Sequence, residues 1–98
     1  MVDHVVLFAV KEDAPAEDAE DLLSSIGDLR SSTTGVTNLS FGEDFSGRGG
    51  DYTRGLFVRL RTADDLQACR EHPENRAIAE KLDELTTGRP VVDYDPEP

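Results

Sequence analysis

The chain has 98 residues and a formal net charge of −11, with 32% charged and 37% hydrophobic residues. So acidic a chain lacks the clustered Lys and Arg that bind nucleic acids or anionic membranes. No basic segment precedes a long apolar run, so we expect neither a signal peptide nor a transmembrane segment. A single cysteine, Cys69, excludes an internal disulfide and is typical of a reducing compartment, which predicts a cytoplasmic protein.

The length predicts one domain over residues 1–98. Its most apolar stretch, residues 3–10, is rich in β-branched and aromatic residues and is predicted to be a strand. Side chains alternate along a strand, so His4, Val6, Phe8 and Val10 share one face, and Val5, Leu7 and Ala9 share the other. Both faces are apolar, so we expect both to be covered.

A helix is predicted over residues 16–30, because Pro15 suits the first turn and apolar residues then recur with helical spacing. The apolar stripe consists of Ala19, Leu22, Leu23, Ile26 and Leu29. Residues 36–41 follow as a second strand, with Thr37, Leu39 and Phe41 on one face. The glycine-rich segment 46–51 is typical of a hairpin loop.

The third predicted strand covers residues 52–61, with Leu56, Val58 and Leu60 on its more apolar face. A short helix begins after Thr62 and ends near His72, because Pro73 disfavours helical backbone in the residue before it. Pro73 can open another helix, whose buried stripe is Ile78, Leu82 and Leu85. Residues 91–95 form the last predicted strand.

This β-α-β-β-α-β order, with a divided second helix, predicts an α+β, ferredoxin-like fold: a four-stranded antiparallel sheet with helices on one face. We assign the more apolar strand faces to the helix side: His4, Val6, Phe8, Val10, Thr37, Leu39, Phe41, Leu56, Val58, Leu60, Val91 and Asp93. The opposite face then carries an apolar patch of Val5, Leu7, Ala9, Phe57, Val92 and Tyr94. Such a patch is too large to leave in water on a monomer, so we expect a second copy to pack on it.

Three segments resemble the stress-responsive dimeric A/B barrel (Dabb) family: the opening Asp3–Phe8, the His72–Asn75 corner and the closing Val91–Tyr94. The resemblance extends over nearly the whole chain, with matching spacing between the segments. It implies a homodimeric α/β barrel, formed by the sheets of two subunits, and a pocket between the sheet and the helices of each subunit.

Plant polyketide cyclase chemistry occurs in this family, and the resemblance implies where its catalytic residues would lie. A His three residues after the corner His and a Tyr three residues before it correspond to Asn75 and Cys69 here. A further His on the third strand corresponds to Arg54. Only the first-strand His4 and the last-strand Asp93 are retained, so the chain departs from the cyclase pattern.

His4 and Asp93 are the candidate catalytic pair, because the last strand should lie antiparallel beside the first. A carboxylate beside an imidazole orients the ring for use as a general base or as an anion-binding group. A purely structural hydrogen bond at the floor of the pocket is the alternative interpretation. His72 is either a helix cap or a catalyst, and Asn75 either caps helix backbone at the first turn or donates to a ligand carbonyl. Arg54 forms a surface salt bridge or contacts an anion at the mouth of the pocket.

We therefore expect a homodimer that binds a small organic molecule in an apolar pocket. The expected pocket residues are Val6, Phe8, Leu22, Leu23, Ile26, Leu39, Arg54, Leu56, Val58, His72, Asn75 and Ile78. One alternative is a polyketide-cyclase-like lyase with His4 as its base. Another is a structural, stress-protective dimer whose own side chains fill the pocket. No Cys and His spacing indicates a metal site, and no cofactor is expected.

Overall fold

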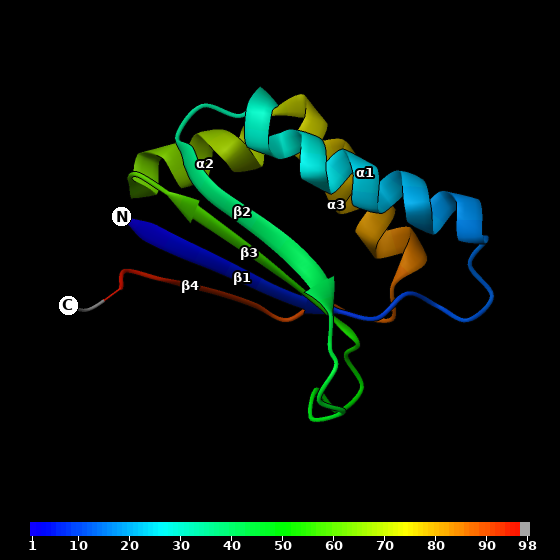
Figure 1. Ribbon diagram of the computed structural model, residues 1–98. Helices are drawn as coiled ribbons and strands as arrows, with labels where there is room; N and C mark the ends of the chain where they lie inside the picture. Colours follow the sequence, from blue (N-terminus) through cyan, green and yellow to red (C-terminus); the bar gives the residue numbers. More distant parts are fainter. Residues whose placement is uncertain (97–98) are drawn as a thin grey trace.

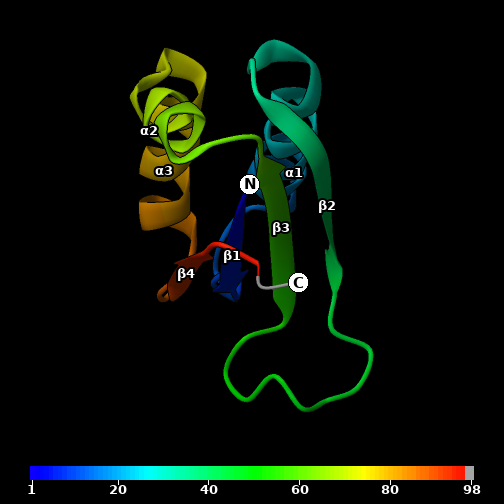
Figure 2. The ribbon, with the colours of Figure 1, turned by 90° about the vertical axis from the view of Figure 1, so that its left-hand side faces the viewer.

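The computed structural model describes residues 1–96 as four strands and three helices in the expected order (Figure 1). The elements are β1 (Val2–Phe8), α1 (Ala16–Ser32), β2 (Val36–Glu43), β3 (Arg54–Leu60), α2 (Ala63–Glu71), α3 (Pro73–Leu85) and β4 (Val91–Tyr94). The strands form one sheet in the order β2-β3-β1-β4, and all neighbouring strands are antiparallel. The helices cover one face of this sheet, so the fold is the α+β, ferredoxin-like arrangement (Figures 1 and 2).

The hydrophobic core lies between the sheet and the helices, as strand alternation and helical spacing predict. Phe8 of β1 and Leu60 of β3 are fully buried there, together with Ile26 of α1. The remaining buried apolar side chains come from every helix and from the three longer strands: Val6, Leu22, Leu29, Leu39, Leu56, Val58, Leu66, Cys69, Ile78, Leu82 and Leu85. The core therefore connects each helix to the sheet.

His72 separates α2 from α3, and local chemistry sets the helix ends. The Thr62 hydroxyl accepts a hydrogen bond from the Asp65 amide at 3.1 Å at the start of α2. The His72 Nδ1 accepts one from the Glu74 amide at 3.2 Å, and Pro73 occupies the first turn of α3. The helix-cap interpretation of His72 is therefore confirmed.

The prediction that Thr37 faces the helices is wrong. A β-bulge between Val36 and Asn38 places Val36 opposite Leu60, where it packs against the core. Thr37 is left exposed, and its hydroxyl donates to the Arg59 carbonyl at 3.3 Å. A bulge adds one residue to one strand, so it reverses the alternation on one side of itself.

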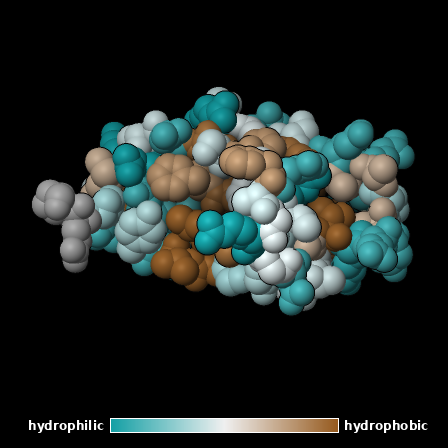
Figure 3. Space-filling model, turned by 60° about the horizontal axis from the view of Figure 1, so that its bottom comes forward, coloured by the Kyte–Doolittle hydropathy of each residue, from teal (hydrophilic) through white to brown (hydrophobic). Residues whose placement is uncertain are grey.

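The sheet face away from the helices is called the open face here, and it carries apolar side chains in register. Val5 lies opposite both Phe57 and Val92, and Leu7, Val92 and Tyr94 are exposed. Ala9, also expected on this face, lies beyond the end of β1. Hydrophobic side chains gather near the middle of this side of the molecule, among polar ones (Figure 3).

An ion pair also belongs to the open face. Asp3 is only 2% exposed, and it accepts hydrogen bonds from Arg59 Nε at 2.6 Å and Nη2 at 2.8 Å. The guanidinium lies 5.5 Å from the centre of the Phe57 ring, within cation–π range. These hydrogen bonds hold the pKa of the Asp3 carboxyl below its usual range. Asp3 and Arg59 face each other directly across β1 and β3, so the pair fixes their register.

Candidate functional site

A cavity of about 310 Å³ lies between the helix side of the sheet and helices α2 and α3. Four polar residues reach it: His4, Arg70, Asn75 and Arg89. The rest of the lining is apolar: Val6, Leu29, Val36, Leu56, Val58, Leu60, Leu66, Cys69, Ile78, Ala79, Leu82 and Val91. Ligand sites typically combine such apolar walls with a few polar groups.

His4 is held by a chain of hydrogen bonds at the wall of this cavity. The strand register places His4 of β1 opposite Asp93 of β4, and the Nδ1–H of His4 donates to Asp93 Oδ1. The other carboxylate oxygen accepts from Arg70 Nη2 at 2.5 Å, at the end of α2. Both oxygens of Asp93 are therefore occupied, and the ring orientation of His4 is fixed by β4 and α2 together.

The arrangement leaves one imidazole nitrogen free for chemistry. His4 Nε2 has no hydrogen-bond partner among the described residues, whereas Nδ1 is hydrogen-bonded to Asp93. Because an ionised carboxylate can only accept, Nδ1 is the donor of this bond. A carboxylate that fixes the tautomer in this way leaves the other nitrogen able to accept a proton. The His4 side chain is 21% exposed, so the ring is sheltered but accessible.

Asn75 and Cys69 are joined to each other on the helix side of the cavity. The Asn75 Nδ2 donates to the Cys69 carbonyl at 2.9 Å and lies 3.7 Å from its sulfur. Asn75 thus satisfies a backbone carbonyl near the end of α2, and it does not cap the first turn of its own helix as expected. Burial raises the pKa of the Cys69 thiol, so the sulfur stays protonated and is a poor nucleophile.

The expected pocket residues separate into two groups. Val6, Leu56, Val58, Asn75 and Ile78 line the cavity together with His4. The structure places the others elsewhere, since Phe8, Leu22, Leu23, Ile26, Leu39, Arg54 and His72 are not among its lining residues. Leu22, Leu23 and Ile26 belong to α1 itself, and Phe8 and Leu39 are core residues of the sheet. Helix α1 covers the β2–β3 side of the sheet, whereas α2 and α3 lie toward β1 and β4 (Figure 2).

Arg54 lies at the far end of the sheet from His4. In the strand register Arg54 lies opposite Phe8 of β1, whereas His4 lies opposite Val58. The Arg54 guanidinium donates a hydrogen bond to the Glu43 carboxylate at 3.0 Å. The surface-salt-bridge interpretation of Arg54 is therefore confirmed.

Sequence reasoning did not place Arg70 or Arg89 at the cavity. Arg70 follows Cys69 at the end of α2, and Arg89 lies in the connection before β4. Alternation offered a signal for Arg89, because it lies two residues before Val91 and four before Asp93. No comparable pattern identifies Arg70, whose long side chain reaches β4 from a helix.

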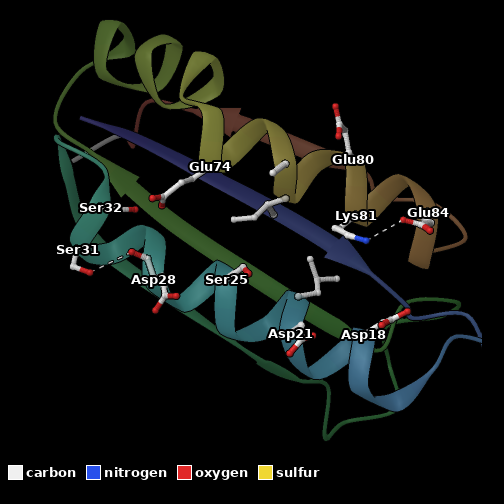
Figure 4. A pocket seen from close by; sticks show the side chains of 13 residues that line it. Asp18, Asp21, Ser25, Asp28, Ser31, Ser32, Glu74, Glu80, Lys81 and Glu84 are labelled. Atoms are coloured by element: carbon white, nitrogen blue, oxygen red, sulfur yellow. Dashed lines mark hydrogen bonds and ion pairs between the residues drawn. The ribbon is translucent and has the colours of Figure 1, made fainter.

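A second hollow, of about 590 Å³, runs between α1 and α3 on the outer side of the helices (Figure 4). Its rim carries six carboxylates and one lysine: Asp18, Asp21, Asp28, Glu74, Glu80, Glu84 and Lys81. Leu22 and Ile78 form part of its floor, and Lys81 pairs with Glu84 at 3.4 Å. We refer to it as the acidic groove.

The described residues, 1–96, contain no group of three His, Cys, Asp or Glu side chains placed to hold a metal ion. None of the described helices has both the length and the hydrophobicity needed to cross a membrane.

Solved structures share this fold along nearly the whole chain. A protein from Arabidopsis thaliana is 20% identical with a TM-score of 0.86, covering 100% of this chain and 97% of that one. A dimeric ferredoxin-like protein of unknown function from Thermobifida fusca is 22% identical with a TM-score of 0.81, covering 95% of this chain and 88% of that one. The hydroxynitrile lyase of Passiflora edulis is 15% identical with a TM-score of 0.87, covering 95% of this chain and 90% of that one. At these identities the likeness establishes the fold alone.

A search of curated protein sequences finds no significant match. The family model of the stress responsive A/B barrel domain, Dabb, matches residues 2–96, which is nearly the full length. That match includes the strand with His4, the corner at His72 and the strand with Asp93. The chain therefore belongs to the stress responsive A/B barrel domain family.

Proposed function

We propose that this chain forms a homodimer through its open face and binds a small organic molecule in the His4 cavity. The observation that carries the proposal is an apolar cavity in whose wall a histidine is oriented by a carboxylate, itself held by an arginine. A histidine so positioned can recognise or react with a polar group on an otherwise apolar ligand.

The exposed apolar side chains support the homodimer. Val92 retains 57% of its surface in the isolated subunit, on the same face as Val5, Leu7 and Phe57. The β2–β3 connection, residues 44–53, projects away from the helices, and its Phe45 is fully exposed (Figures 1 and 2). A partner on the open face would cover these side chains. The similar protein from Thermobifida fusca is described as dimeric.

The size of the cavity favours a ligand over a structural role alone. Its volume of about 310 Å³ lies at the lower end of the range of about 300–1,000 Å³ that ligand pockets occupy. A purely stress-protective dimer has no need for this space, and its own side chains would fill it. Because most of the lining is apolar, we expect the ligand to be small and largely hydrocarbon or aromatic.

Two measurements test this proposal. Sedimentation should give twice the 10.7 kDa mass of one chain at micromolar concentration. A panel of small aromatic and aliphatic compounds at millimolar concentration should contain members that raise the melting temperature. Val58→Phe should remove that rise by filling the cavity, whereas Ala68→Phe, on the exposed side of α2, should retain it. A folded monomer, or no rise with any compound, contradicts the proposal.

A second candidate function, a lyase, is favoured by the free Nε2 of His4. An imidazole fixed through Nδ1 by Asp93 is arranged as a general base toward the cavity. Base-catalysed cleavage of a cyanohydrin illustrates the chemistry: the base takes the hydroxyl proton, the carbon–carbon bond breaks, and a carbonyl compound and cyanide leave. The hydroxynitrile lyase from Passiflora edulis has a similar fold.

Substitution of His4 separates the two candidates. A binder shows no turnover with or without His4, and its ligand affinity falls in His4→Ala only if His4 contacts the ligand. A lyase loses turnover in His4→Ala, measured as release of the carbonyl product, while ligand affinity is retained. Asp93→Asn should then lower turnover as well, because the ring loses its oriented tautomer. Unchanged turnover in His4→Ala contradicts His4 as the base.

A further inference from the structure

The charged side chains that line the His4 cavity, Arg70 and Arg89, are both cationic. Arg70 and Arg89 reach it with His4, and no Asp or Glu is among its lining residues, in a chain with 21 acidic and 10 basic residues. The acidic groove shows the opposite arrangement, with carboxylates along its rim (Figure 4). The cavity is thus an exception to the charge distribution of the chain.

Both guanidinium groups retain donors for a ligand. Arg89 uses one amino group to pair with Asp83, which is 72% exposed, so solvent competes with this ion pair and a ligand can replace it. Arg70 uses Nη2 to hold Asp93. Each guanidinium has five N–H donors, so several remain on each side chain. An arginine suits a carboxylate because two parallel hydrogen bonds can form.

Asp93, the carboxylate bonded to the lining residues His4 and Arg70, does not oppose an anion strongly. Asp93 bonds His4 through one oxygen and Arg70 through the other, so its negative charge is offset by its neighbours. Val91 and Asp93 occupy alternate positions of β4 and so share a face, and Arg89 lies two residues before Val91, in the connection that precedes the strand. Arg70 and Arg89 therefore lie toward β4, and the wall built by β3 and α3 is apolar except for Asn75.

From this arrangement we infer that the ligand is an organic anion, a small carboxylic acid with an apolar body. Arg89 and Arg70 bind its carboxylate on the β4 side, and the hydrocarbon part lies against Val58 and Ile78. Local cations are needed for such a ligand, because the net charge of −11 repels anions at long range. The inference rests on the proposed function, since it assigns the ligand class of the same cavity.

The test compares benzoate with benzamide, which has the same shape and no charge. Isothermal titration with the full-length protein should show benzoate binding about tenfold more tightly, since hydrogen bonds to a charged group are about twice as strong. Arg89→Gln should reduce the preference to a few-fold, and Arg89→Lys should restore part of it. Arg76→Gln, an exposed position of α3 outside the cavity, is the matched control and should leave the preference unchanged.

The possible outcomes distinguish this inference from the proposed function. Equal or tighter binding of benzamide overturns the anionic ligand and leaves the pocket proposal intact. Binding of neither compound at millimolar concentration overturns both. A benzoate preference that survives in Arg89→Gln and in Arg70→Gln also overturns the inference, since the charge would then be recognised elsewhere. The comparison in the unsubstituted protein needs no variant, so it stands even if a variant fails to fold.

Discussion

Val92→Asp is the sharpest test of the proposed homodimer, because Val92 lies on the open face and is 57% exposed in the isolated subunit. Burying a whole valine side chain contributes about 1.5–2 kcal/mol. The exposed 57% therefore corresponds to about 1 kcal/mol per subunit. A two-fold interface contains the residue twice, so the loss is about 2 kcal/mol, or about thirtyfold in Kd.

The introduced carboxylate adds to this loss. Removing an ion from water costs several kcal/mol, so the dimer Kd should rise by about a thousandfold or more. Sedimentation velocity over a range of concentrations should show Val92→Asp as a folded monomer where the unchanged protein is a dimer. Ala68→Asp adds the same charge at an exposed position of α2 and should leave the dimer intact. If Val92→Asp sediments as the unchanged protein does, the open face is not the interface.

Three further predictions concern the subunit itself. Phe8 is fully buried, so Phe8→Ala should lower the free energy of unfolding by about 3–5 kcal/mol, measured by urea titration at fixed protein concentration; a loss no larger than that of a surface substitution would contradict the packing. The lowered folded-state pKa of Asp3, caused by Arg59, stabilises the fold above about pH 4. This stability is lost as pH falls through the lowered pKa, so the urea midpoint should fall more steeply with acid in the unchanged protein than in Asp3→Asn, and parallel curves would refute the coupling. Because burial raises the pKa of Cys69, iodoacetamide should alkylate it slowly in the folded protein and rapidly in urea, as mass spectrometry can measure; equal rates would show an accessible thiolate.

Local patterns in the sequence determined the order of the elements and the face of most strand residues. Alternation along residues 3–10 placed Val6 and Phe8 on the side that the helices cover, and helical spacing gave each helix one buried stripe. The contact between His4 and Asp93 also followed from alternation and antiparallel pairing, and the structure confirms that contact. These features depend on periodicity, which a single segment carries within itself.

Only the tertiary structure decided which polar groups surround the cavity and which of the expected pocket residues are packed in the core away from it. The bulge between Val36 and Asn38 depends on how β2 pairs with β3, and no residue in that segment predicts it. Arg70 reaches Asp93 from a helix, and Arg59 meets Asp3 across two strands distant in the chain. A long, flexible side chain can reach several neighbours, and the packing of the elements determines which of them lie within reach. Such contacts therefore cannot be predicted from local sequence.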